Sequence, residues 1–387
     1  MNMAPDLTVE CPPATDGEIA VVNLQSARRR SWSRFSENPH RPGVAELIVE
    51  QEWQVAQFLG DFNALDRLEM LVIQLVHAEV PPVRRALIQA QVASIGHRFD
   101  EARGHLEVAE GMGAEPESVS RLASTIDQAC GARLDELLDA RRRSAAGSDS
   151  LEELVPLGAL LMDLNKFTEA DEVYRRALRL YSVVSPFAVA LVCFQLGLLW
   201  GEAVADRQTR VAAQWYHKAI DYLPSYTKAR VHLAEIYSSW GQLDEAETLL
   251  APMVASSDPE VRWRLADVLL ARGNVANAEG HLQAARSRFE DLLGRHLLAF
   301  ADHGAEFYAA SGNDSRRALD LAYINVANRP TLRAFEQAHA IAVRVGNVDA
   351  AAELQAEATQ RWSAHAAFHS SSLKTRAETM ERGETAS

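Results

Sequence analysis

The sequence has few cysteines and no arrangement of them that is typical of a metal site. Cys11, Cys130 and Cys193 lie far apart, without C-x-x-C spacing. A disulfide framework is therefore not expected, and a reducing compartment fits. The chain begins Met-Asn-Met-Ala-Pro-Asp, without the basic residues and apolar stretch of a secretory signal. We therefore expect a cytoplasmic protein.

Long apolar runs and positive charge are also scarce. The most apolar run, from Pro186 to Trp200, is interrupted by Gln195. It is shorter than the ~18 residues of a membrane span, so it predicts a buried helix and no membrane span. The 39 Lys and Arg residues are outnumbered by 53 Asp and Glu residues, for a net charge of -14. Because phosphate binding needs a positive surface, we expect no nucleic-acid binding.

Motifs of catalysis are missing as well. Gly111-Met112-Gly113 lacks the third glycine of a dinucleotide loop, and the sequence contains no P-loop and no G-x-S-x-G element. His365 and His369 are four residues apart, a spacing that could hold a metal on a helix, but no Glu follows the first histidine. We therefore expect no catalytic residue, no metal and no cofactor, and predict that the protein is not an enzyme.

The two ends of the chain differ from its middle. Residues 1–42 contain five prolines and little helical periodicity, which predicts a flexible N-terminal arm. Residues 366–387 are rich in Ser, Thr, Glu and Arg, which predicts a flexible C-terminal tail.

Between these ends the sequence repeats itself with a period near 34 residues. Three units share one internal spacing of a residue pair, a further helix residue, a glycine and an alanine. The units are Leu233-Ala234, Tyr237, Gly241 and Ala246; Leu265-Ala266, Leu269, Gly273 and Ala278; Ala338-His339, Ala342, Gly346 and Ala351. The small residues allow two helices to approach closely, and the glycines suit the left-handed conformation that ends a helix. Such a period with two helices per unit predicts a helical repeat array.

The pattern resembles the tetratricopeptide repeat family. Ala212, Tyr216, Ala219 and Pro224 match the family's second-helix series, although about three extra residues separate Gly197 from Ala212. The resemblance implies an all-α fold, a right-handed superhelical solenoid of about nine antiparallel helix pairs. We expect degenerate hairpins over residues 43–150 and a regular array over residues 151–365.

In this family the first helix of each repeat lines a concave groove. The resemblance therefore places in the groove the following residues: Lys228, Val231, Glu235, Trp263, Asp267, Leu270, Asp302 and Glu306. An acidic stripe with an exposed Trp suits a basic or amphipathic segment of a partner, and a solvated helix face is the alternative. The Lys and Asn residues with which chaperone-binding members hold a C-terminal carboxylate are absent, so that function is disfavoured.

The N-terminal arm contains a basic segment with two aromatic residues: Arg28, Arg29, Arg30, Trp32, Arg34 and Phe35. This segment is interpreted as a docking peptide for an acidic groove or as a small nucleic-acid or membrane contact, with a solvated arm as the alternative. A tethered peptide acts at high effective concentration, so the segment is hypothesised to occupy the acidic groove and to inhibit partner binding.

Three functions follow, in decreasing order of support. The first is a non-catalytic scaffold or adaptor that binds a partner protein in its groove. The second is a regulatory protein of the same fold that senses a peptide or small ligand. The third, least supported, is a metal-dependent enzyme using the C-terminal histidines.

Overall fold

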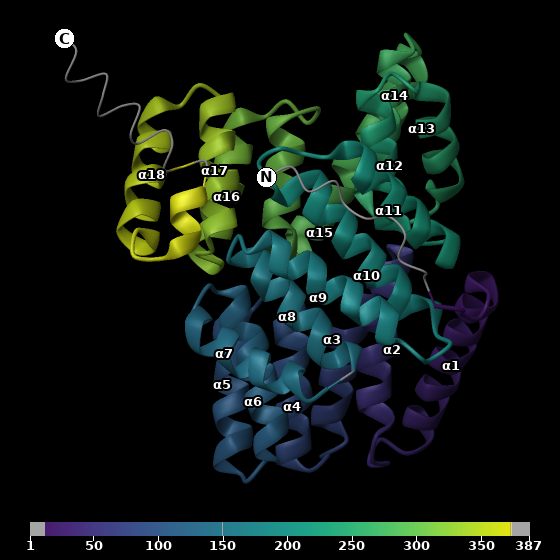
Figure 1. The fold of residues 1–387 in the computed structure, drawn as a ribbon. Helices are drawn as coiled ribbons and strands as arrows, with labels where there is room; N and C mark the ends of the chain where they lie inside the picture. The colour runs from purple at the N-terminus through teal and green to yellow at the C-terminus, as the bar shows by residue number, and fades with distance from the viewer. Residues whose placement is uncertain (1–11, 149, 372, 374–387) are drawn as a thin grey trace.

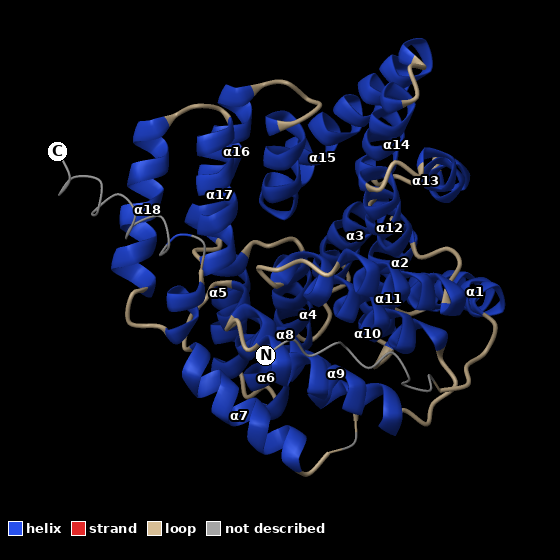
Figure 2. Cartoon of the chain, turned by 45° about the horizontal axis from the view of Figure 1, so that its top comes forward, coloured by secondary structure: helices blue, strands red, loops and turns tan. Residues whose placement is uncertain are grey.

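The chain folds into α-helices joined by short turns. The structure, a computed structural model, describes residues 12–148, 150–371 and 373, and among them there is no β-strand (Figures 1 and 2). The helices are α1 (Gly17–Glu37), α2 (Val44–Leu59), α3 (Asn63–His77), α4 (Pro82–Ile95), α5 (Phe99–Gly111), α6 (Pro116–Ala129), α7 (Leu134–Ala146), α8 (Leu151–Asp163), α9 (Phe167–Leu180), α10 (Pro186–Leu198), α11 (Thr209–Tyr222), α12 (Thr227–Ser239), α13 (Leu243–Leu250), α14 (Pro259–Ala271), α15 (Val275–Ala309), α16 (Ser315–Asn328), α17 (Leu332–Arg344) and α18 (Val348–Trp362). Three short segments complete them: η1 (Leu199–Ala203), η2 (Ala251–Met253) and η3 (Ala366–Ser370).

From α2 onward, the described helices pack as nine consecutive antiparallel pairs, as predicted. The helix α15 belongs to two of them, because its backbone is non-helical at His296 (φ -135°, ψ 49°). Its first part packs on α14 and its second part on α16. The pairs form the predicted right-handed superhelical solenoid, and the kink at His296 takes the place of a loop between two repeats.

Small residues on first helices allow close helix packing. A Cβ atom added to Gly197 on α10 would lie 2.3 Å from Cε1 of Tyr216 on α11, and one on Gly158 would lie 2.5 Å from Cε1 of Tyr174. The glycines expected to end first helices, Gly241, Gly273 and Gly346, have φ of 77°, 77° and 75°. The repeat pattern therefore has the physical basis that the sequence suggested.

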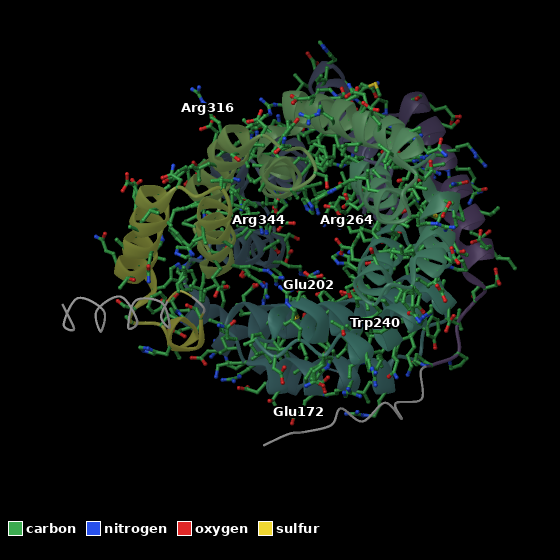
Figure 3. All side chains as sticks on the ribbon, turned by 90° about the horizontal axis from the view of Figure 1, so that it is seen from above. Glu172, Glu202, Trp240, Arg264, Arg316 and Arg344 are labelled. Atoms are coloured by element: carbon green, nitrogen blue, oxygen red, sulfur yellow. The ribbon has the colours of Figure 1, made fainter. Side chains whose placement is uncertain are left out.

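The superhelix returns on itself, so that its two halves touch. The Phe62 ring lies 5.0 Å from the Phe300 ring, and Asn328 Nδ2 donates to the backbone oxygen of His97 over 3.0 Å. Asp66 on α3 accepts from His296 Nε2 at the kink of α15 over 2.8 Å. Seen from above, the helices surround a central opening (Figure 3).

The predicted flexible arm is wrong for the described residues 12–42, because residues 17–37 form the helix α1. Asp16 caps this helix by accepting from Ile19 N, and Phe35 is buried at 1% exposure. The prolines that suggested disorder, at positions 12, 13, 39 and 42, flank the helix without entering it. Residues 1–11 lie outside the described part of the chain.

The predicted flexible tail is also wrong at its start. Phe368 and Leu373 are buried, Asn165 Nδ2 donates to the backbone oxygen of Ala367 over 3.0 Å, and Gln355 Nε2 donates to that of Leu373 over 2.9 Å. These apolar side chains cover α17 and α18, the last helix pair among the described residues. Residues 374–387 lie outside the described residues.

Residues 186–203, which are α10 and η1, are long and apolar enough to cross a membrane by length and composition alone. More than half of this stretch is buried inside the molecule, where α10 packs on α11 and α9. Its apolar sequence thus serves packing on several sides, as the sequence predicted.

Candidate functional site

Three adjoining cavities lie along the inside of the superhelix, with volumes of about 480, 520 and 430 Å³. Glu306, Arg333 and Gln337 line all three, so they are parts of one space, which we call the central channel. In the view from above, Arg264, Arg344 and Glu202 lie around the opening, whereas Glu172 and Arg316 lie on the outside (Figure 3).

First helices of successive pairs supply one wall of the channel. Their lining residues recur at spacings of three and four, which places them on one helical face. They are His232, Glu235, Ile236 and Ser239 on α12, Glu260 and Arg264 on α14, Asp302, His303 and Glu306 on α15, and Arg333, Glu336, Gln337, Ala340 and Arg344 on α17.

A local departure from the repeat supplies two further lining residues. The extra residues between Gly197 and Ala212 form a π-helical turn, η1, and the loop after it. Glu202 lies in η1 and Arg207 in the loop, and both line the channel across from α17. The longer turn therefore brings charged side chains to a place where a regular repeat has only a tight turn.

One chain of ion pairs crosses α12 and α14. His232 Nδ1 lies 2.7 Å from Glu202 Oε1 and 3.5 Å from Glu235 Oε2. Glu235 Oε1 in turn lies 2.5 Å from Arg264 Nη2, and the Arg264 guanidinium is 3.6 Å from the centre of the Trp263 ring. Glu202, His232 and Arg264 each come from a different repeat, and Glu235 lies on the same helix as His232.

A second chain joins α14, α15 and the end of α16. His303 Nδ1 lies 2.6 Å from Glu260 Oε1, and Asp302 Oδ2 lies 3.5 Å from Arg329 Nη1. His303 Nε2 is 3.9 Å from Asp302 Oδ1, which links the two pairs.

Both histidines are cationic at neutral pH. Burial alone would lower the pKa of His232, but Glu202 and Glu235 outweigh it and raise that pKa to about 9. Burial likewise opposes protonation of His303, yet Asp302 and Glu260 raise its pKa to about 10.

The channel is electrically balanced, which corrects the predicted acidic stripe. Among the described side chains that line it, seven are cationic and seven are anionic. The cations are Arg207, Arg264, Arg329, Arg333, Arg344, His232 and His303, and the anions are Asp163, Glu202, Glu235, Glu260, Asp302, Glu306 and Glu336. The excess negative charge of the chain, -14 in total, therefore lies elsewhere.

A family model for the tetratricopeptide repeat matches residues 157–183, which cover most of the α8–α9 hairpin. The chain therefore contains a tetratricopeptide repeat. The packing of Gly158 against Tyr174 inside this match is the same as that of Gly197 against Tyr216 in the next repeat.

One curated relative of this tetratricopeptide-repeat protein is the protein O-mannosyl-transferase Tmtc3 of Drosophila melanogaster, 32% identical over 147 residues. The match covers 36% of this chain and 15% of Tmtc3. Similar solved structures include pilF of Pseudomonas aeruginosa (TM-score 0.32, 14% identity, 59% of this chain and 97% of that one). Another is the APC/C hetero-tetramer Cut9-Hcn1, with a TM-score of 0.41 and 12% identity over 93% of this chain and 74% of that one. A third is the human IFIT1 dimer with m7Gppp-AAAA, with a TM-score of 0.35 and 13% identity over 92% of this chain and 97% of that one.

The predicted groove residues of the repeat protein are divided between channel and core. Glu235, Asp302 and Glu306 line the channel. Asp267 lies half-buried beside it and accepts from Ser311 Oγ over 2.6 Å. Lys228 lies half-buried in the first turn of α12 and lines none of the three cavities.

The predicted groove position is wrong for two residues. Trp263 and Val231 are each 1% exposed. The Trp263 ring packs edge-on against the rings of both Phe289 and Phe307, at 6.2 and 5.4 Å, and Val231 packs in the core of the α12–α14 segment. Both lie on the helical face that meets the neighbouring repeat, so no exposed Trp anchors a ligand there. Leu270 is 44% exposed but lines none of the three cavities.

Sequence reasoning missed Glu202, Arg207, Arg333 and Arg344. The signal for the α17 pair was present, because Arg333, Gln337, Ala340 and Arg344 follow one helical face. The sequence contains extra residues after Gly197, but it does not indicate that they enter the channel.

The basic N-terminal segment does not occupy the channel, so the autoinhibition hypothesis is wrong. Trp32 Nε1 donates to Glu52 Oε1 over 2.7 Å, and Arg28 Nη1 lies 3.4 Å from Glu52 Oε2. Phe35 is buried, while Arg29, Arg30 and Arg34 are exposed. The segment thus fixes α1 to α2 through the fully buried Glu52.

The C-terminal histidines do not share a helical face. His365 precedes η3 with extended backbone and lies 3.7 Å from Asp135, whereas His369 is an exposed residue within η3. Among the described residues, no group of three or more His, Cys, Asp or Glu side chains could hold a metal ion.

Proposed function

We propose that this tetratricopeptide-repeat protein is a non-catalytic cytoplasmic scaffold that binds a segment of a partner protein in the central channel. The observation that carries the proposal is the channel itself, a continuous space lined by first helices of successive repeats. Tetratricopeptide repeats generally bind proteins or peptides. Repeats of this kind present extended concave surfaces, and a peptide segment is the ligand that such a surface suits.

The charge of the channel bears on the kind of segment. The sequence favoured a basic or amphipathic partner, because Glu235 and Asp302 belong to a predicted acidic stripe with an exposed Trp. Both carboxylates have cationic partners within the molecule, Arg264 and Arg329. A purely basic segment would have to displace these partners, so we propose an amphipathic segment.

A sensor of a small ligand is the second candidate. Each of the two larger cavities has a volume of about 500 Å³, within the range of ~300–1,000 Å³ that small-molecule sites occupy. Thermal-shift measurements with peptide and metabolite pools separate this candidate from the first. A free metabolite that raises the melting temperature favours the sensor.

The test of the scaffold is affinity capture with the full chain, followed by mass spectrometry. Ala340 is exposed on α17 and lines the channel, so Ala340→Trp narrows the channel without touching the core. The matched control is Ala276→Trp, at an exposed helical alanine that lines none of the three cavities. We expect partners that bind the wild type and the control but not Ala340→Trp. Equal capture by all three proteins would mean that the channel is not the binding site.

A further inference from the structure

Three arginines of the channel face one cavity without strong partners. Arg333 and Arg344 lie on the channel face of α17, and Arg207 lies on the loop after η1. All three line the cavity of about 480 Å³. We call Arg207, Arg333 and Arg344 the arginine cluster.

The guanidinium groups of the cluster have unused hydrogen-bond donors. Within the described part of the chain, the guanidinium groups of Arg207 and Arg344 make no hydrogen bond or ion pair. Arg333 makes a single contact of 3.5 Å, to Glu202, and its side chain is 57% exposed. A guanidinium has five donors in a planar fork that matches a carboxylate.

The carboxylates of the same cavity, in contrast, already have partners. Glu202 is paired with His232, and Asp163 accepts from Gln128 Nε2 over 2.6 Å. Glu306 accepts from Gln337 Nε2 over 2.6 Å, and Glu336 is also engaged. The hydrogen-bonding groups that remain unused in this cavity are therefore N–H donors of the arginine cluster. A ligand with acceptor oxygens satisfies these donors.

Apolar side chains lie in the same cavity. Met162 at the end of α8, Phe167 at the start of α9 and Val204 after η1 all line it. A ligand that fits both surfaces carries carboxylates toward the arginine cluster and apolar groups toward these three side chains.

We propose that the arginine cluster binds Asp or Glu side chains of an amphipathic acidic peptide segment. The proposal rests on the proposed function and names the chemistry of its partner. It reverses the sign expected from sequence, because Glu235 and Asp302 of the predicted acidic stripe are paired internally. Of the arginines, only Arg333 has a carboxylate contact, at 3.5 Å. The balanced charge of the channel lets an acidic segment enter although the chain as a whole is acidic.

The experiment is a selection of random peptides displayed on phage against the full chain. The peptides are joined to the coat protein through their C-termini, so that they offer no terminal carboxylate. We expect the selected peptides to be enriched in Asp and Glu next to apolar residues. Synthetic, amidated copies are then measured by fluorescence anisotropy. The double variant Arg333→Gln/Arg344→Gln should weaken their binding about tenfold or more, as expected for lost charge-assisted hydrogen bonds.

Arg316→Gln is the matched control, because Arg316 is exposed on the outside of the ring (Figure 3). It should bind as the wild type does, and circular dichroism melts should be alike for all variants. Basic or neutral selected peptides, or equal binding by the double variant, would overturn the inference. If Ala340→Trp still blocks those peptides, the channel binds peptides and the proposed function stands.

Two further outcomes of the peptide selection would also overturn the inference. If a selected peptide binds only with a free C-terminal carboxylate, the cluster recognises a chain end and the inference fails. If no peptide is enriched, the inference fails too, and affinity capture with Ala340→Trp judges the proposed function separately.

Discussion

His232 Nδ1 and Glu202 Oε1 lie 2.7 Å apart and join the first helix of one repeat to the π-helical turn of the preceding one. The contact is on the channel wall, where Glu235 and Glu260 also act on the imidazole. It fixes the position of η1, and the loop that follows η1 carries Arg207 into the channel lining. The protonation of one histidine is thereby linked to the shape of the channel.

This link predicts a pH-dependent stability. Because the folded pKa of His232 is raised to about 9, its contribution is fully present below the unfolded value of about 6.5. The contribution is lost as the pH rises through about 9. His232→Gln should therefore be less stable than the wild type at neutral pH, and the difference should shrink in alkali. Denaturant unfolding across the pH range measures it.

His281→Gln is the control for this prediction. Burial and Arg262 lower the pKa of His281, so it is neutral at pH 7 and its variant should show no such convergence. A constant gap between His232→Gln and the wild type across the pH range would contradict the assigned pairing.

Gly197→Ala tests the close packing of α10 on α11. The new Cβ would lie 2.3 Å from Tyr216 Cε1, so the ring must move, at a cost of about 1–3 kcal/mol. Gly280→Ala is a matched change inside α15, where a Cβ would meet nothing within 4 Å. It should stabilise the protein by about 0.5–1 kcal/mol, because Ala loses less backbone entropy in a helix. Chemical denaturation measures the free energy of unfolding of both variants. If Gly197→Ala and Gly280→Ala change it in the same direction, the packing argument is refuted.

Ala246→Arg or Ala278→Arg tests the repeat register. Ala246 and Ala278 are 0% and 1% exposed, so an arginine must overpack the helix interface and bury a charge. The expected destabilisation is about 3 kcal/mol or more. Ala276→Arg, at an exposed position of α15, should melt close to the wild type. Wild-type melting of both core variants would show that the register is wrong.

Glu52→Gln tests how α1 is held. Glu52 is fully buried and pairs with Arg28 and with Arg67, whose Nη2 lies 2.8 Å away. The Glu52→Gln change leaves Arg28 and Arg67 with Asp61 as their remaining carboxylate partner. The loss of the charged hydrogen bonds to Glu52 should destabilise the protein by about 1–3 kcal/mol. Trypsin should then cut faster at Arg29 and Arg30, which limited proteolysis measures.

Glu50→Gln provides the comparison, because Glu50 is exposed on the same helix. Its cleavage rate should match that of the wild type. If Glu52→Gln is cut no faster than Glu50→Gln, α1 is held by its apolar face alone.

The helix pairs could be predicted from the sequence, because the contacts that form them are local. Gly241 and Ala246 act within one hairpin, and Gly158 meets Tyr174 only 16 residues further on. The repeat spacing therefore determined the all-α fold and the helix pairs, and the resemblance to the tetratricopeptide repeat family implied that first helices form the concave wall. The pairs could be predicted because they need few long-range contacts. Patterns in a single sequence do not show long-range contacts.

Tertiary structure decided the rest. Asp66 meets His296 although 230 residues separate them, so closure of the ring left no local signal. Glu235 and Asp302 belong to the acidic stripe predicted from the sequence, and only tertiary packing gave them Arg264, from the next repeat, and Arg329, at the end of α16. The sequence by itself determined which residues are charged and which helices carry them. Which charges cancel and which remain available depends on distances across repeats, and these exist only once the superhelix has closed.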